Sequence, residues 1–593
     1  MVRRISYTNQ GWVTYLLTRN RFRSIIFLSK AVSYLKEGSP MKNALWFACL
    51  VFLSNCTSSP AQKSVESPPP IQVADTHYYT PRYGDGEFYT PERLTEFRNL
   101  RIYEVMVESF MDGDPQSNMD QGYGTSHHRG DIRGITQSLD YIKDLGYNAL
   151  WVTPVFFVGG NTKLDATGYF PQDYFKIEPR FGTLEDAREL VIQAHNRGLY
   201  VFFDAVFGHN KLGLHPSPSG ILPEIKTKGS QGSTVFFDQG KVYQNSVDFF
   251  IEVATYWIQE LEIDGWRLDV AYELKQGRHI FWQEIREAVQ DLCLERAGEG
   301  KYWGTLGFMV AETWKSAGEI TTLTFGRESN KGVFCAFDFP LRYELMNTLA
   351  TGEGNNSPER LGDARHLSEA FNSHALAPQW GFYALMLGNH DLVRFGDLIQ
   401  RSQGLRYGPE NPDYWKRHQL AFAFQAAYTG PIMNYYGEEI GEQLGAYAGG
   451  EDFSDKVPHT AATPSAQWGV ADDHVARTSG RIEGLNTTLT PREKELKNYL
   501  RHLLAMRASH PALYDGVRIP LTVEGSLYAD LKVKGDGKIL FLANLGTESI
   551  DFSLAVEGAS AQPLGPDKFN AELDHGNIRG TLPGLSAEFY LIK

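Results

Sequence analysis

Short apolar runs recur along the chain from about Leu100 onward, and a stretch with helical spacing follows most of them. Eight of these runs have the length and the β-branched or aromatic character of buried strands. They lie at residues 101–110, 149–156, 199–207, 265–271, 308–314, 333–340, 382–391 and 431–439. Alternation of buried strands and helices is typical of βα units around a parallel sheet. Eight such units predict an α/β fold built on a (β/α)8 TIM barrel.

The intervening segments carry recognisable helix signals. Thr183 and Asp186 have the spacing of a capping box, an apolar stripe follows them, and Gly198 ends the pattern before the next strand. A second helix is expected over Val247–Glu262, where apolar residues return every three or four positions. These helices are expected to cover the outside of the barrel.

Two regions break the alternation of strands and helices. Residues 209–246 are rich in Gly, Pro and Ser and are longer than an ordinary βα loop, which predicts a small inserted domain after the third strand. Residues 515–593 contain short strands and turns without a helical stripe, which predicts a C-terminal antiparallel β-sandwich. The barrel is therefore expected to occupy residues 77–208 and 247–514.

The first 76 residues have a different character. Residues 41–56 hold a lysine, an apolar run too short to span a bilayer and then Cys56, and "LSNC" resembles the lipobox of bacterial lipoproteins. This resemblance implies a lipoprotein-type signal peptide, acylation of Cys56, and an exported protein held to a membrane by lipid. An ordinary signal peptide or an uncleaved anchor are the alternatives. Residues 1–40 are then expected to be an upstream extension that is not part of the mature protein, and residues 57–76 are expected to form a flexible linker.

Composition narrows the range of partners. The formal net charge of −14 gives no electrostatic footprint for nucleic acid and no attraction to anionic lipid. The four cysteines show neither metal-ligand spacing nor a dense disulfide pattern. A neutral substrate is compatible with this balance, and no motif for an organic cofactor is recognised.

Polar residues gather where the predicted strands end. In a TIM barrel the C-terminal ends of the strands form the active site, so acids from different strands meet there. Two carboxylates across a cleft are the minimal machinery for cleaving a glycosidic bond. Arg267 and Asp269 share one face of their strand, and a buried ion pair seldom improves stability over apolar packing, which favours a functional role. The candidates at the strand ends are Asp204, His209, Arg267, Asp269, Glu312, Asn389, His390 and Asp391.

Four sequence blocks in order, "DAVFGH", "GWRLD", "VAETW" and "GNHD", resemble the conserved blocks of the α-amylase family, glycoside hydrolase family 13. The loops "GYFPQDYFKIEPRFGT" and "YYGEEIG" are also similar to loops of that family. The resemblance covers residues 100–593 and is closest in wording to the neopullulanase and cyclomaltodextrinase group.

The resemblance implies roles for individual residues. Asp269 would be the nucleophile, Glu312 the general acid/base and Asp391 a third catalytic carboxylate, in a retaining hydrolysis of α-1,4 and potentially α-1,6 glucosidic bonds in maltooligosaccharides or starch-like glucans. The alternatives are a 4-α-glucanotransferase or α-glucosidase with the same acids, or a non-catalytic glucan-binding lipoprotein. The implied substrate-binding residues are Tyr169, Asp204, His209, Arg267, Asn389 and His390.

One further loop resembles a calcium site. The segment "DGDPQSNMD" spaces side-chain oxygens closely after the first predicted strand, at Asp112, Asp114, Asn118 and Asp120. Oxygen ligands of this kind suit a structural Ca²⁺ ion. A solvated polar turn would have the same composition and is the alternative interpretation.

Overall fold

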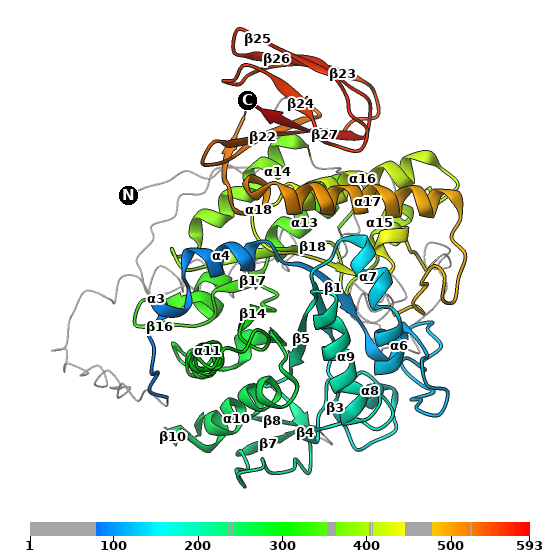
Figure 1. Cartoon of the computed structure of the whole chain (residues 1–593). Coiled ribbons are helices and arrows are strands. Elements are labelled where there is room, and N and C mark those ends of the chain that lie inside the picture. The colour runs from blue at the N-terminus through cyan, green and yellow to red at the C-terminus, as the bar shows by residue number, and fades with distance from the viewer. Residues whose placement is uncertain are drawn as a thin grey trace, which may run out of the picture. The chain divides into compact units, whose positions relative to one another are not determined.

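Eight parallel strands close into a barrel (Figure 1). The computed structural model describes residues 79–593 except 229–230, 235–236, 239–240, 243, 353–362, 403–404, 406, 445–476 and 522–524. Each strand pairs in parallel with both neighbours, and the barrel order is β1-β19-β18-β17-β14-β11-β5-β2. All eight predicted strands are present, so the predicted barrel is confirmed. The strands are β1 Arg101–Val105, β2 Ala149–Val152, β5 Tyr200–Ala205, β11 Gly265–Leu268, β14 Phe308–Ala311, β17 Cys335–Phe337, β18 Phe382–Met386 and β19 Ile432–Tyr435.

Helices surround the strands and bury an apolar face against them. The helix α9 starts at the predicted capping box, in which Thr183 and Asp186 satisfy each other's backbone N–H groups. The helix α10 begins at Gln244, three residues before the predicted start at Val247, because its first turn is polar and gives no apolar signal. The larger barrel helices are α6 Ile132–Gln137, α7 Leu139–Leu145, α9 Leu184–Asn196, α10 Gln244–Leu261, α11 Trp282–Gly298, α13 Phe339–Leu349, α16 Pro412–Ala426 and α17 Pro491–Ser509.

The segment between β5 and α10 forms small antiparallel sheets beside the barrel. One sheet has three strands, β6 Asn210–Lys211, β8 Gln231–Thr234 and β7 Ile225–Lys228, and a hairpin follows from β9 Phe237–Asp238 and β10 Lys241–Val242. Another pair, β3 Phe156–Phe157 and β4 Asp173–Ile177, follows β2. These strands extend the C-terminal side of the barrel, where the site lies.

Two antiparallel sheets form the C-terminal domain and confirm the predicted sandwich. Leu540, Phe552 and Tyr590 belong to the apolar cluster between them. The domain packs on α16, where the Phe424 and Phe541 rings meet at 5.1 Å between centroids. The first sheet is β20 Val517–Pro520, β21 Leu527–Lys534, β22 Gly537–Asn544, β27 Ser586–Ile592 and β24 Ala561–Pro563; the second is β23 Ile550–Ala555, β26 Asn577–Leu582 and β25 Ala571–Asp574.

Short elements occupy the remaining described segments. Among the described residues, no helix combines the length and the apolar character needed to cross a bilayer. The predicted signal peptide, Cys56 and the linker lie outside the described residues. The short elements are α3 Asp85–Phe88, α4 Pro91–Arg98, α5 Val107–Phe110, α8 Lys163–Ala166, η1 Ala271–Glu273, β12 Lys275–Gln276, β13 His279–Ile280, α12 Ala317–Ile320, η2 Thr321–Phe325, β15 Gly326–Arg327, β16 Asn330–Lys331, α14 Ala364–Ala370, η3 Phe371–Leu376, α15 Phe395–Arg401, η4 Glu438–Ile440 and α18 Pro511–Asp515.

Candidate active site

Arg267 joins three carboxylates from three neighbouring strands. Its side chain is fully buried near the end of β11, and Nη1 donates to both oxygens of Asp204 at 2.9 Å and to Asp269 Oδ1 at 2.8 Å. Its Nη2 lies 2.8 Å from Glu312 Oε1. Arg267 is directly opposite Asp204 on β5, and Glu312 follows the end of β14 on the other side. The parallel register therefore brings together the acids that the sequence predicted. We call Arg267, Asp204, Asp269 and Glu312 the Arg267 cluster.

Asp204 is the anchor of this cluster. It has no exposed surface, and it also accepts hydrogen bonds from Trp151 Nε1 at 3.1 Å and from the Tyr169 hydroxyl at 2.8 Å. The Arg267 guanidinium lies 4.9 Å from the Trp151 ring centroid, within the range of a cation–π contact. A buried carboxylate with this many donors holds Arg267 in one place, and Arg267 in turn fixes the position of Asp269.

A strained turn connects Asp269 to Glu312. Val270 has φ 43° and ψ 44°, a left-handed conformation that is rare for a β-branched residue and costs of order 1–3 kcal/mol. In this conformation its backbone N–H donates to Glu312 Oε2 at 3.1 Å. The turn thus orients one carboxylate immediately after the residue that carries the other.

A second charged group faces the same cavity, and we call Glu104, His390, Asp391 and Arg477 the His390 cluster. His390 Nδ1 lies 2.6 Å from Glu104 Oε1, and its Nε2 lies 3.2 Å from Asp391 Oδ2. Arg477 Nη2 donates to Asp391 Oδ1 at 3.0 Å. The Asp391 backbone N–H donates to Asn389 Oδ1 at 2.9 Å, which orders the turn after β18. Asp391 is therefore held between two cationic groups.

Both clusters open into a cavity of about 230 Å³. The side chains of Asp269 and Glu312 are each 6% exposed, whereas the side chain of Asp391 is 23% exposed. The Tyr169 ring stacks on the His390 ring at 5.1 Å with an interplanar angle of 18°. The cavity is lined by Leu164, Thr167, Tyr169, Phe170, His209, Asp269, Val270, Tyr272, Glu312, Trp314, Asp391 and Arg477.

The Arg267 cluster has more carboxylates than cations, and this affects its protonation. Burial raises the pKa of Asp269 well above the ordinary value; Arg267 opposes the shift, while the negative charges of Glu312 and Asp204 add to it. Burial also raises the pKa of Asp204 against the same arginine. Because these groups interact strongly, the protons that they bind belong to the cluster and not to one residue. A cluster that retains a proton beside an ionised carboxylate has what general acid catalysis needs.

The two histidines of the site differ in charge at neutral pH: one is neutral and the other is a cation. Burial lowers the pKa of His209 to about 4, so its imidazole is neutral; its Nε2 lies 3.7 Å from Asp269 Oδ2. Burial alone would lower the pKa of His390 too, but the carboxylates of Asp391 and Glu104 raise it to about 9. His390 is therefore a cation that stabilises Asp391 in its ionised form.

The nine predicted catalytic and substrate-binding residues all lie in or around this one site. Five line the cavity: Tyr169, His209, Asp269, Glu312 and Asp391. The other four, Asp204, Arg267, Asn389 and His390, are at most 1% exposed and lie behind the lining side chains. In this arrangement they position the lining groups.

Sequence reasoning missed three supporting residues. Glu104 lies inside the first predicted strand, which also contains Glu108, so the presence of an acid in this run does not single it out. Trp151, in the second strand, carries no signal that separates it from a core aromatic residue. Arg477 lies outside every predicted strand and is recognisable only through its contact with Asp391.

In the loop predicted to bind calcium, two of the four candidate ligands form ion pairs with arginines. Asp114 Oδ2 pairs with Arg133 at 2.8 Å, and Asp120 Oδ1 pairs with Arg129 at 2.8 Å. Asp112 Oδ1 and Asn118 Oδ1 are buried, and neither has a hydrogen-bond partner among the residues that the structure describes. Within the described ranges, no group of three or more His, Cys, Asp and Glu residues is arranged to hold a metal ion.

Comparison with known proteins agrees with this geometry. The family model described as alpha amylase, catalytic domain, matches residues 104–213 and 238–479. A cyclomaltodextrinase of Thermoanaerobacter pseudethanolicus is 27% identical over 408 residues, 61% of this chain and 61% of the relative. A cyclomaltodextrinase of Geobacillus thermopakistaniensis is 25% identical over 530 residues, 83% of this chain and 76% of the relative. The chain thus spans about three fifths of the length of the first of these relatives.

A solved structure is more similar than these relatives. The crystal structure of an AmyP variant in complex with maltotriose has a TM-score of 0.75 and 40% identity, and the match covers 85% of this chain and 99% of that one. The two cyclomaltodextrinases belong to the group that the sequence motifs resembled, and their similarity supports that resemblance. With the family model matching more than half of its residues, among them the strands that carry all three acids, the chain belongs to the alpha-amylase family.

Proposed function

We propose that this protein is a retaining α-glycoside hydrolase that cleaves α-glucosidic bonds in maltooligosaccharides or starch-like α-glucans. The observation that carries the proposal is the attachment of Asp269 and Glu312 to one buried guanidinium at 2.8 Å each, facing a cavity that Asp391 also lines. Two carboxylates held this close to each other suit the retaining mechanism, which needs a nucleophile and an acid/base near one bond.

In the first step, a carboxylate oxygen of Asp269 attacks the anomeric carbon. Glu312 gives its proton to the glycosidic oxygen, the carbon–oxygen bond breaks, and the shortened sugar leaves. A glycosyl ester on Asp269 results, and Glu312 is now ionised. Arg267 contacts both carboxylates, so it can stabilise the negative charge as that charge moves from Asp269 to Glu312.

In the second step, Glu312 takes a proton from a water molecule that attacks the same carbon. The ester bond to Asp269 breaks, the anomeric configuration of the substrate is kept, and Glu312 regains its proton. Asp391, held by His390 and Arg477, accepts hydrogen bonds from sugar hydroxyls. An acceptor sugar in place of water would give transfer by the same chemistry.

Two further observations support an α-glucan substrate. Tyr272 and Trp314 line the cavity next to Glu312, and Trp314 is 38% exposed, so aromatic surface is available to sugar rings. Cyclomaltodextrinases are among the relatives, and the AmyP variant was solved with maltotriose. The resemblance of the motifs to the neopullulanase and cyclomaltodextrinase group is the reason to include α-1,6 as well as α-1,4 bonds in the proposal.

Product analysis tests this function. The full chain is incubated with maltoheptaose, panose, pullulan and cyclodextrin, and products are separated by chromatography beside a Glu312→Gln control. Shorter sugars from the parent alone support the hydrolase and show the bond cleaved. Longer sugars would indicate a glucanotransferase, and unchanged sugars in all four reactions would contradict the proposal.

We further propose a structural calcium ion in the loop after β1. The unsatisfied oxygens Asp112 Oδ1 and Asn118 Oδ1 support it, because hard cations take such ligands. The arginine pairs of Asp114 and Asp120 oppose it, since those carboxylates would have to change partners. Calcium should raise the thermal unfolding midpoint of the parent and not that of an Asp112→Ala variant. Equal midpoints with calcium and with a chelator would refute the site.

We also propose that the protein is an exported lipoprotein anchored through Cys56. The support is the sequence of residues 41–56, in which Ser54 and Asn55 separate a short apolar run from this cysteine. Cys56→Ala should release the protein from the membrane fraction of a bacterial host, while a Cys49→Ala control should not. Release of neither variant or of both would contradict an anchor at Cys56.

A further inference from the structure

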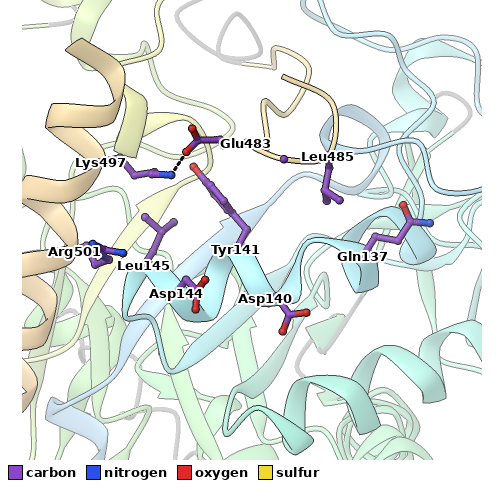
Figure 2. Close-up of a pocket in the computed structure, with 10 residues that line it drawn as sticks. Gln137, Asp140, Tyr141, Asp144, Leu145, Glu483, Leu485, Lys497 and Arg501 are labelled. Carbon is purple, nitrogen blue, oxygen red and sulfur yellow. Dashed lines mark hydrogen bonds and ion pairs between the residues drawn. The ribbon is translucent and has the colours of Figure 1, made fainter. Parts of the chain in front are cut away.

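A second pocket lies between α7 and α17, away from the proposed catalytic machinery (Figure 2). Its volume is about 360 Å³, larger than the cavity at the active site and within the roughly 300–1,000 Å³ of small-molecule sites. None of its lining residues lines the active-site cavity. The mechanism above therefore leaves this pocket without a role.

Two charged side chains in this pocket have no partner. Asp144 of α7 and Arg501 of α17 line it, and neither forms an ion pair or hydrogen bond within the part of the chain that the structure describes. The neighbouring charges behave differently: Asp140 pairs with Arg197 at 2.7 Å, and Glu483 pairs with Lys497. Asp144 and Arg501 are thus an acceptor and a donor that remain available to a ligand.

The pocket also offers apolar surface in a fixed orientation. The Tyr141 hydroxyl donates to Glu439 Oε1 at 2.9 Å, which anchors the ring from behind. Leu485 is 50% exposed at the rim. Figure 2 shows Tyr141 in the centre, with Lys497 on one side of it and Leu485 on the other. A held aromatic ring beside an exposed leucine can pack against the C–H faces of a sugar.

The balance of charge points to a neutral ligand. Three carboxylates and two cations line the pocket, so neither sign dominates as it would in a site for phosphate or a polycation. Sugar hydroxyls both donate and accept hydrogen bonds, and therefore match a carboxylate and a guanidinium that are not paired with each other. The lining charges are Asp140, Asp144, Glu483, Lys497 and Arg501.

We propose that this pocket is a non-catalytic binding site for an α-glucan chain, with Tyr141 and Leu485 as the packing surface and Asp144 and Arg501 as the hydrogen-bonding groups. The inference rests on the proposed function, because the enzyme's own substrate is the neutral polyhydroxyl ligand it would encounter. A second contact on one long chain raises the effective concentration of that chain at the active site. Short substrates cannot use both sites.

Calorimetric titration with maltoheptaose tests the proposal. The background is the full chain with Glu312→Gln, which prevents turnover. We expect two classes of site in this background, one class after adding Asp144→Ala and Arg501→Ala, and two classes after adding the control changes Arg492→Ala and Glu495→Ala. The control removes an exposed ion pair from α17. Like the test pair, it removes one acidic and one basic side chain, so both variants keep the net charge of the background.

The outcomes separate this proposal from the proposed function. Two classes of site that persist in the Asp144→Ala, Arg501→Ala variant, or a single class in the Glu312→Gln background itself, would overturn the second site and leave the hydrolase intact. No binding by any variant would overturn both. In the active parent, the same double change should lower kcat/KM on a long soluble α-glucan by about 10-fold and leave kcat/KM on maltotriose unchanged. Equal losses on both substrates would also overturn the second site.

Discussion

The Arg267 cluster and the His390 cluster face one cavity, yet they hold their carboxylates with different cations. Arg267 is always charged, so the cation in its ion pairs with Asp269 and Glu312 is present at every pH. His390, with a pKa raised to about 9 by Asp391 and Glu104 against the effect of burial, loses its charge in alkali. The proposed chemistry thus rests on a permanent charge, whereas the proposed substrate contact rests on a titratable one.

Exposure follows the same division. The side chains of Asp269 and Glu312 are each 6% exposed, and the side chain of Asp391 is 23% exposed. Electrostatic interactions are stronger where water is excluded, which favours bond cleavage in the Arg267 cluster. A more open carboxylate can exchange water for sugar hydroxyls. The two clusters should therefore respond differently when they are altered.

The largest effect is expected in the Arg267 cluster, from loss of the nucleophile. Asp269→Asn should lower kcat/KM on maltoheptaose by roughly 10⁴-fold, because an amide cannot form the glycosyl ester. The thermal unfolding midpoint, measured alongside, serves as the control for folding. A variant that releases reducing sugar at the parent's rate would remove Asp269 from the mechanism.

A large stability effect is expected from Arg267 itself. Arg267→Met leaves buried acids without their cation and should lower the free energy of unfolding by about 3–5 kcal/mol, measured in urea. Arg267→Lys keeps the charge but cannot reach three carboxylates at once. The free energy of unfolding of this variant should therefore lie between those of Arg267→Met and the parent. Equal stability of Met and Lys variants would show that the guanidinium geometry is unimportant.

A smaller effect is expected at the His390 cluster. Arg477→Gln removes one charged hydrogen bond from Asp391, and bonds of this kind contribute about 1.5–3 kcal/mol. Steady-state kinetics should show kcat/KM reduced by about 10-fold or somewhat more, with Asp269 still able to form its ester. A loss as large as that of Asp269→Asn would contradict the division between the two clusters.

The smallest effect at neutral pH is expected from titration of His390. Its folded pKa of about 9 lies above the ordinary value of 6.5, so the stability it contributes is complete below about pH 6.5 and is lost as the pH rises through about 9. The difference in free energy of unfolding between the parent and His390→Gln should therefore shrink between pH 6 and pH 10. A constant difference would exclude this role for the His390 charge.

The barrel could be predicted from the sequence because parallel strands are buried on both faces and read as continuous apolar runs. The site acids could be predicted because they stand at the ends of those runs. Glu104, Trp151 and Arg477 could not, since their roles depend on contacts that the folded barrel creates. The same limit applies to the loop after β1, where Arg129 and Arg133 pair with carboxylates that ligand spacing alone assigned to a cation.

Trapping the covalent intermediate tests the central claim most directly. Fluoride leaves without help from an acid, so α-maltosyl fluoride can glycosylate Asp269 in the Glu312→Gln variant, while loss of the base slows hydrolysis of the ester. Peptide mass spectrometry should find one added maltosyl group on the peptide that contains Asp269, and none when Asp269→Asn is added. An adduct on another residue, or α-maltosyl fluoride consumed with inversion and no adduct, would contradict the account.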